Sequence, residues 1–266
     1  MNKPKVIFFG NGPLVTAVYG GLKDHIELLF WAKKKEDLDE VEKIKSGSEQ
    51  KIYAILASFG VLIPKRILDL FEPEGILNIH PSLLPDLRGP SPIETAILRG
   101  DTEFGVSVMK LVSKMDAGPI YHREKKSYNK FVQKSEIYES LGRAGAEWLV
   151  ANLTDLPEPI SQNEKMATYC QKLDTSMAML RPMMQTAEEM MDQVRAFAGF
   201  PKTRIEISGV DCIVLGAHIS NEPEEIRGHK ELSLKGKDGF YLVIDELQPA
   251  GRKVMGADAF VNGYLR

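Results

Sequence analysis

Short apolar runs alternate with segments of helical periodicity through the first 153 residues of the chain. The run at residues 5–9 ends in a glycine turn, and residues 14–22 then carry apolar side chains at helical spacing, which is the pattern of a buried strand followed by a helix. Strands that alternate with helices predict an α/β fold with a doubly wound parallel sheet. The same order repeats, with further strands expected at 26–31, 53–57, 75–79 and 105–110 and further helices at 33–45, 93–99 and 137–153.

A stretch with two prolines and many polar residues, 154–166, separates this pattern from a different one. Its composition is typical of a linker between domains. We therefore expect two domains, residues 1–153 and residues 167–266, the second a small β-rich barrel or sandwich. The pattern beyond the linker predicts short strands at 203–208, 212–217, 231–234 and 240–247, with helices at 187–197 and 257–265.

The overall composition narrows the classes of function. With 34 Lys and Arg against 37 Asp and Glu, the net charge is -3 and gives no global electrostatic argument for a nucleic-acid partner. No apolar run approaches the ~20 residues needed to span a bilayer, so we expect no membrane association. The two cysteines, Cys170 and Cys212, have no paired spacing and no neighbouring histidine cluster, which predicts neither a disulfide nor a metal site and favours a reducing cytoplasm.

Two polar residues mark the end of the expected strand at 75–79. Asn78 and His80 are two positions apart, so strand alternation directs them to the same side, and open α/β sheets bind ligands at the carboxyl ends of their strands. Acyl transfer uses a group that donates a hydrogen bond to the carbonyl oxygen and a group that exchanges protons. An amide beside an imidazole can provide both. A lone histidine is often a structural hydrogen-bonding group, so the pair alone leaves both interpretations open.

Asp116 and the turn at residues 10–12 also allow two interpretations each. Asp116 stands in a turn just before Gly118, where an aspartate usually caps its own backbone; beside His80 it would instead orient the imidazole and favour its charged form. Sequence spacing alone does not bring the two together. The turn Gly10-Asn11-Gly12 lacks the third glycine and the acidic residue of a dinucleotide site, so a turn that packs a helix on a sheet is favoured.

A series of motifs runs through the first domain and comprises Asn78–Pro85 (NIHPSLLP), Arg88-Gly89, Pro92-Ile93, Gly105-Val106 and Met115–Gly118. This series resembles the catalytic domain of formyltransferases that use 10-formyltetrahydrofolate. The resemblance implies a Rossmann-like first domain in which Asn78, His80 and Asp116 form the catalytic group. It also implies that the folate donor is bound by two segments, with contacts from Ser58, Phe59, Gly60, Ile63, Ser82, Leu83, Leu84 and Pro85.

Three motifs lie beyond the linker, namely Arg195–Phe197, Leu247–Lys253 and Phe260–Gly263. They are similar to the C-terminal domain of the methionyl-tRNA formyltransferase family. This resemblance implies an OB-like β-barrel as the second domain and charged initiator tRNA as the acceptor of the formyl group, for translation initiation. Arg252 and Lys253, which follow a Pro-Ala-Gly turn, are the expected phosphate contacts. We expect a cytoplasmic enzyme that acts as a monomer and needs no metal.

Two features leave other functions open. Family members carry a long basic loop between the second and third strands, whereas this chain has only residues 32–52 there, and residues 167–266 hold 12 basic against 14 acidic side chains. An alternative function is therefore formyl transfer to a small amine such as an amino-sugar nucleotide. A third hypothesis, from a different class, is a folate-binding or RNA-binding protein without activity.

Overall fold

The computed structural model describes residues 3–265, which form two compact units. The first unit runs to Ile93 and resumes at Thr102–Gln171, and the second comprises Glu94–Asp101 and the chain from Lys172 onward. The helix α4 (Pro92–Leu98) spans the first of these boundaries. Within residues 3–265, none of the helices is long and apolar enough to cross a membrane.

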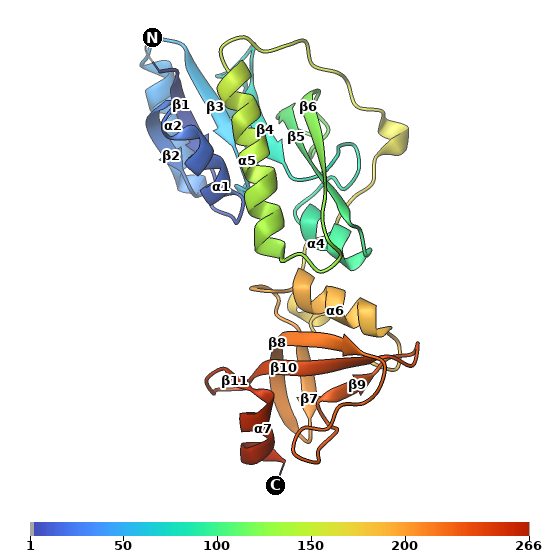
Figure 1. Ribbon diagram of the computed structural model, residues 1–266. Helices are drawn as coiled ribbons and strands as arrows, with labels where there is room; N and C mark the ends of the chain where they lie inside the picture. Colours follow the sequence, from blue (N-terminus) through green and yellow to red (C-terminus); the bar gives the residue numbers. More distant parts are fainter. Residues whose placement is uncertain (1–2, 266) are drawn as a thin grey trace. The chain divides into compact units, whose positions relative to one another are not determined.

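The first unit is built on a six-stranded sheet (Figure 1). Its strands are β1 (Lys5–Phe9), β2 (Glu27–Ala32), β3 (Ile52–Leu56), β4 (Ile76–His80), β5 (Glu103–Lys110) and β6 (Ile120–Ser127). They lie in the order β2-β1-β3-β4-β5-β6, the first four parallel and the last two antiparallel to their neighbours. The Rossmann-like fold expected from the sequence is confirmed, with an antiparallel pair of strands added to its parallel part.

Burial explains which strands the sequence revealed. Strands β3 and β4 are buried at every position, and such continuous apolar runs are typical of parallel strands covered on both faces. In β6 only Ile120 is fully buried, and the polar residues that follow it gave no apolar pattern to recognise. The apolar pattern therefore indicated β5 but not its antiparallel partner β6.

Helices cover both faces of the sheet. The side chain of Phe9 in β1 packs in one core with Ile67 of the short third helix. Phe8 points the opposite way, and its ring centroid lies 6.0 Å from that of Tyr19 in the first helix. The helices that lie wholly in this unit are α1 (Val15–Leu22), α2 (Leu38–Ser46), α3 (Lys65–Asp69) and α5 (Lys134–Asn152). Of these, α1 and α5 pack against each other (Figure 1).

The connection between β2 and β3 is compact. It consists mainly of a 3-10 turn, η1 (Lys35–Asp37), and α2. The backbone N–H groups of Lys33 and Lys34 donate to Oδ2 of Asp37 over 2.7 and 3.1 Å. Lys33, Lys34 and Lys35 thus lie at the start of a short helical segment.

The second unit is a curled antiparallel sheet with helices α6 (Ala187–Ala196) and α7 (Ala257–Tyr264) (Figure 1). Its strands are β7 (Arg204–Ile207), β8 (Val210–Ser220), β9 (Ser233–Lys235), β10 (Tyr241–Pro249) and β11 (Met255–Gly256). The order is β11-β10-β8-β7, with β9 also paired to β10. The OB-like second domain is confirmed; among residues 3–265 no ladder joins β7 to β9, so the sheet curls without closing completely.

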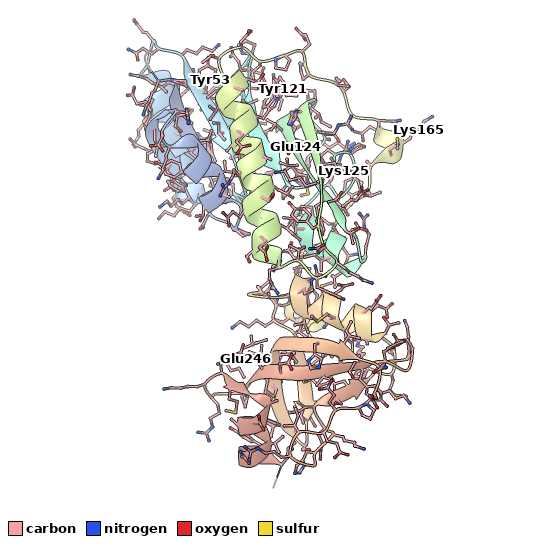
Figure 2. All side chains as sticks on the ribbon, in the orientation of Figure 1. Tyr53, Tyr121, Glu124, Lys125, Lys165 and Glu246 are labelled. Atoms are coloured by element: carbon pink, nitrogen blue, oxygen red, sulfur yellow. The ribbon has the colours of Figure 1, made fainter. Side chains whose placement is uncertain are left out.

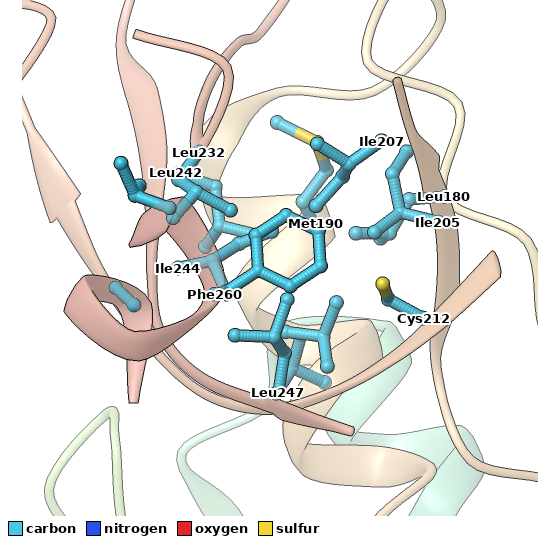
Figure 3. Close-up of a cluster of buried hydrophobic side chains, with 14 of the residues drawn as sticks. Leu180, Met190, Ile205, Ile207, Cys212, Leu232, Leu242, Ile244, Leu247 and Phe260 are labelled. Carbon is cyan, nitrogen blue, oxygen red and sulfur yellow. The ribbon is translucent and has the colours of Figure 1, made fainter. Parts of the chain in front are cut away.

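One aromatic residue fills the centre of this second core. Phe260 of α7 is 0% exposed, and Figure 3 shows it among side chains that include Met190 of α6 and Ile244 of β10. The start of α6 is fixed by a capping box, in which Thr186 Oγ1 accepts from the N–H of Glu189 and the Glu189 carboxylate accepts from the N–H of Thr186. The capping box therefore fixes the start of α6, and Met190 packs the helix into this core.

Gly20 and Gly21 of α1 offer a matched test of the packing between α1 and α5. A Cβ on Gly21 would lie 2.7 Å from the Cβ of Ala146 in α5, whereas a Cβ on Gly20 would meet nothing within 4 Å. We expect Gly21→Ala to lower the free energy of unfolding by about 1–3 kcal/mol through overpacking. Gly20→Ala should raise it by up to about 1 kcal/mol through helix propensity. Urea denaturation would measure both changes, and equal effects would contradict the close helix contact.

Candidate active site

Asn78 and His80 lie at the carboxyl end of β4, where the parallel part of the sheet meets its antiparallel part. β4 is hydrogen-bonded to β3 on one side and to β5 on the other, which fixes its backbone. Both side chains are buried, each 5% exposed, and their two-residue spacing sends them to the same face. The sheet therefore presents an amide and an imidazole side by side on a rigid strand.

Asp116, from the turn between β5 and β6, lies beside both residues. Its Oδ1 accepts a hydrogen bond from Nδ2 of Asn78 (3.4 Å), and its Oδ2 accepts one from the backbone N–H of Gly89 (2.8 Å). The Nδ1 atom of His80 is 3.7 Å from the same Oδ2. The fold thus brings together the three residues that the sequence motifs singled out, and the loop after β4 adds Gly89 as a further partner.

The hydrogen bond on the other side of the His80 ring determines which nitrogen can exchange a proton. Nε2 is 2.9 Å from the carbonyl oxygen of Leu87, and because a carbonyl oxygen only accepts, Nε2 carries a hydrogen. Nδ1 is therefore the atom that gains or loses a proton, and it faces the carboxylate of Asp116. An imidazolium formed here would have an anionic partner within ion-pair distance.

The segment at residues 82–85 is held against β5 by a serine that the sequence analysis did not single out. Ser107 is fully buried in β5; its Oγ donates to the carbonyl oxygen of Ser82 (2.7 Å) and accepts from the N–H of Leu84 (3.0 Å). Gly105 leaves room for this loop segment, because a Cβ at that position would lie 2.2 Å from the side chain of Leu83. A polar residue within an otherwise apolar strand was the available signal for Ser107.

The second expected folate segment, residues 58–63, follows β3 at the same edge of the sheet. Leu56, the last residue of β3, pairs with Asn78 of β4, so this segment begins next to the strand end that carries the polar cluster. Phe59 and Ile63 are buried, at 5% and 6% exposed, and anchor the segment in the core. Both expected folate segments therefore flank the same strand end.

The backbone of this segment turns sharply. Ser58 has φ +51° and Gly60 has φ +68°, and both values lie in the left-handed region. The carbonyl oxygen of Ser58 accepts from the N–H of Asn11 (3.1 Å), and a Cβ on Gly12 would lie 2.5 Å from the Cβ of Ser58. The glycine turn at residues 10–12 is thus a place of close packing, as the sequence favoured.

The residues from 160 to 170, called here the 160–170 segment, pack on the first unit. Ile160 exchanges two backbone hydrogen bonds of 2.8 Å with Ile120. Farther along, the N–H of Arg88 donates to the carbonyl oxygen of Thr168, and the carbonyl oxygen of Arg88 accepts from the N–H of Cys170, both over 2.9 Å. The sequence predicted only a linker over the first half of this segment, and nothing in its composition indicated such ordered contacts.

Arg88 connects the loop after β4 to this segment through its side chain. It is 0% exposed, and its guanidinium donates to both oxygens of the Glu164 carboxylate, over 2.8 and 3.2 Å. The hydrogen bond to Glu164 raises the pKa of Arg88, and the bonds from Arg88 and then Lys114 lower the pKa of Glu164 from 4.5 to about 2. Glu164 itself stays at the surface in the turn η2 (Glu164–Met166), where Figure 2 shows the neighbouring Lys165 pointing outward.

The two cysteines are free and buried, each in a different unit. Burial raises the pKa of both thiols, which disfavours the thiolate needed of a nucleophile or metal ligand. In the described part of the chain, no group of three or more His, Cys, Asp or Glu side chains could hold a metal ion.

Arg252 and Lys253 belong to the second unit, in the exposed turn between β10 and β11. The N–H of Arg252 donates to the carbonyl oxygen of Pro249 (3.0 Å), and the side-chain amide of Gln248 donates to the carbonyl oxygen of Arg252 (2.8 Å). Both residues are exposed. The backbone is thus ordered while both charged groups are available to a ligand.

Two family models match the chain. One, described as Formyl transferase, matches residues 20–153, and the other, described as Formyl transferase, C-terminal domain, matches residues 173–265. The chain belongs to the formyl transferase family. The matched segments cover Asn78, His80 and Asp116 in the first case and the curled sheet with α7 in the second.

Relatives with curated names support the same family. This formyl transferase is 34% identical over 256 residues to the methionyl-tRNA formyltransferase of Bacillus pumilus, a match that covers 91% of this chain and 78% of that protein. Among solved structures, the methionyl-tRNA formyltransferase from Clostridium thermocellum has a TM-score of 0.69 at 19% identity, over 93% of this chain and 98% of that one. Both similarities extend through the two units.

A second fold similarity involves a longer protein. The crystal structure of HypX from Aquifex aeolicus in complex with tetrahydrofolic acid has a TM-score of 0.77 at 16% identity and covers all of this formyl transferase. The chain spans about half the length of HypX, 48% of it. At this identity the similarity shows a shared fold.

The Arg88–Glu164 pair predicts a pH dependence of stability in this formyl transferase. The pKa of Glu164 is lowered in the folded state, so its stabilising contribution is complete above its ordinary value of 4.5 and disappears as the pH falls toward about 2. We expect the difference in free energy of unfolding between wild type and Glu164→Gln to be constant from pH 7 to pH 5 and to become smaller below pH 5. Urea titrations at several pH values would measure this, and a difference that does not change with pH would contradict the ion pair.

Proposed function

We propose that this protein transfers the formyl group of 10-formyltetrahydrofolate to the amino group of methionyl-tRNA, the modification of initiator tRNA that serves translation initiation. The observation that carries the proposal is the convergence of Asn78, His80 and Asp116 at the carboxyl end of β4. The chain's membership of the formyl transferase family and its similarity to proteins named methionyl-tRNA formyltransferases support it.

The reaction exchanges one C–N bond for another. The neutral amine attacks the formyl carbon, the bond from that carbon to N10 of the folate breaks, and one proton moves in net from the amine to N10. Negative charge grows on the formyl oxygen in the transition state, so hydrogen-bond donors and positive charge placed there lower the barrier. We assign these roles to the side-chain amide of Asn78 and to protonated His80.

Each residue of the cluster has a distinct task in this scheme. The amide of Asn78 carries two hydrogens, of which one is directed at Asp116 and the other is available to the formyl oxygen. His80 exchanges a proton at Nδ1, because Nε2 is held by the carbonyl oxygen of Leu87. Asp116 fixes His80 and provides the carboxylate through which a proton is relayed.

We assign the folate donor to the two segments that flank the end of β4. Ser82, Leu83, Leu84 and Pro85 would bind one part of the folate, and Ser58, Phe59, Gly60 and Ile63 would present backbone groups to the pterin. The chemistry of these segments fits such a ligand. Ser58 and Gly60 have a left-handed backbone and lie outside the sheet ladders. The carbonyl oxygen of Ser58 accepts from the N–H of Asn11, and the peptide groups of Gly60 can pair with the edge of a polar heterocycle.

We assign the domains as residues 1–153 for catalysis, 154–166 as linker and 167–266 as an OB-like domain that contacts tRNA. Arg252 and Lys253 are the phosphate contacts in this proposal, because they are exposed cations in a turn with an ordered backbone. We further propose that the enzyme acts as a monomer in the cytoplasm.

A small amine, such as an amino-sugar nucleotide, is the second candidate acceptor. The observation that favours it is the compact connection between β2 and β3, where a short helix occupies the place of a long basic loop. A panel of acceptors separates the two functions. We expect tetrahydrofolate release with charged initiator tRNA and none with amino-sugar nucleotides, and the reverse result would replace the acceptor.

Replacing His80 tests the catalytic assignment. We expect His80→Ala to lower kcat for formyl transfer by roughly two to four powers of ten, because it removes a proton-exchanging group and positive charge beside the formyl oxygen. Asp116→Asn should also lower kcat, because the amide keeps the size but cannot pair with imidazolium. Circular dichroism would confirm that both variants fold. Activity of His80→Ala close to that of wild type would remove His80 from the mechanism.

The salt dependence of tRNA binding tests Arg252 and Lys253. With few phosphate contacts, log affinity should fall with log salt at a shallow slope, on the order of three to five. Replacing both residues by Ala should reduce the slope by about two and weaken tRNA binding, without changing the affinity for folate. A double variant with the slope and affinity of wild type would show that these side chains are only solvated.

A further inference from the structure

We infer that Gln162, in the 160–170 segment, is a positioning residue that holds Asp116 in its working geometry. The inference rests on the proposed function, because it takes Asp116 to be part of the catalytic cluster. Gln162 lies 46 residues along the chain from Asp116, in a segment that the sequence analysis treated as a linker. Its side chain nevertheless reaches the backbone of the Asp116 turn.

All hydrogen-bonding groups of the Gln162 amide are used. Nε2 donates to the carbonyl oxygen of Asp116 (2.8 Å) and to that of Gly118 (2.7 Å). Oε1 accepts from Nε and Nη2 of Arg88, over 3.0 and 2.7 Å. Because a guanidinium only donates and a carbonyl only accepts, the orientation of the amide is fixed by its partners. One side chain therefore links the Asp116 turn to the buried arginine.

The Asp116 turn needs such support. Asp116 has φ +47°, a left-handed backbone that costs a non-glycine residue energy unless its surroundings hold it there. The turn is also crowded, because a Cβ on Gly118 would lie 1.8 Å from the carbonyl oxygen of Lys110. Gln162 bonds to the carbonyl groups on both sides of Ala117 and so holds the two ends of the turn in register.

Arg88 supplies the other end of this connection. Its guanidinium is fully buried, and its backbone is hydrogen-bonded to Thr168 and Cys170. Both the side chain and the backbone of Arg88 are therefore held in place. The next residue, Gly89, donates its N–H to Oδ2 of Asp116. The same arginine therefore orders the group that contacts the Asp116 carboxylate and the group that holds the Asp116 backbone.

Without Gln162, the turn should relax and Asp116 should move relative to Asn78 and His80. Catalysis is sensitive to such movement, since a displacement of about 1 Å can cost roughly 100-fold in rate. We expect Gln162→Leu, which keeps the size but removes both donors, to lower kcat by about 100-fold. The KM for the folate donor should change by less than about threefold, because the lost contact acts on the transition state.

Two further variants separate the functions of the amide. Gln162→Glu retains acceptors for Arg88 but cannot donate to the two carbonyl groups, so it should lose as much kcat as the leucine variant. Glu164→Gln is the matched control, because Glu164 also contacts Arg88 but reaches the Asp116 turn only through the side chain of Lys114, a contact that glutamine can still accept. Its kcat should stay within about twofold of wild type. Full activity of Gln162→Glu would overturn the inference.

A double-mutant cycle distinguishes positioning from general structural support. If Gln162 acts through Asp116, the double variant Asp116→Asn with Gln162→Leu should be no slower than Asp116→Asn alone. Losses that multiply would show that Gln162 acts elsewhere and would overturn the inference. Wild-type activity of the single variant Asp116→Asn would instead refute the assignment of Asp116, and with it the basis of both proposals.

A crystal structure of Gln162→Leu gives a readout that does not depend on the acceptor. We expect the turn to change conformation and Oδ2 of Asp116 to move out of hydrogen-bonding distance of the Gly89 N–H. If the wild-type enzyme formylated no acceptor, the proposed function would fail, yet this structure would still decide the positioning role. An unchanged turn, with the 2.8 Å contact retained, would overturn it.

Discussion

The burial of the Arg88 guanidinium is the constraint on which the rest of the site depends. A buried cation without partners is strongly unfavourable, so a chain that places arginine in this loop must also supply groups to surround it. Those groups, Gln162, Glu164 and Tyr169, all come from the 160–170 segment. The requirement explains why a stretch with the composition of a linker packs on the first unit, and why its contacts extend to the turn that carries Asp116.

The elements that could be predicted from the sequence are those in which buried apolar residues recur at a regular spacing or form a continuous run. β3 and β4 are buried along their whole length, and α5 carries an apolar face over five turns' worth of residues, so each stands out in the chain. The sequence pattern did not indicate β6, whose polar residues have no such period, or α3, whose five residues are too few to show one. The parallel part of the sheet was predicted from the alternation of strands and helices, while its strand order and the antiparallel addition were not.

The candidate site likewise contains some residues that a local sequence rule places together and others that only distant contacts bring in. That Asn78 and His80 share one face follows from strand alternation, a local rule. That Asp116 meets them depends on the register of β4 with β5 and on the turn that follows, and only the resemblance to a known family anticipated it. Gln162 and Ser107 act through side-chain hydrogen bonds to distant backbone groups, and such contacts leave no periodic pattern in a sequence.

The residues of the cluster are held by different physical means. Asn78 and His80 are on a strand that is hydrogen-bonded on both sides, so their positions are a property of the sheet. Asp116 is on a turn with unfavourable backbone geometry, and its position is determined by hydrogen bonds from three separate parts of the chain, at Asn78, Gly89 and Gln162. The sheet can therefore tolerate change around its edges with little effect on the imidazole, whereas the carboxylate depends on every one of its partners. Variation in the loops of such a fold should accordingly affect the Asp116 side of the cluster before it affects the His80 side.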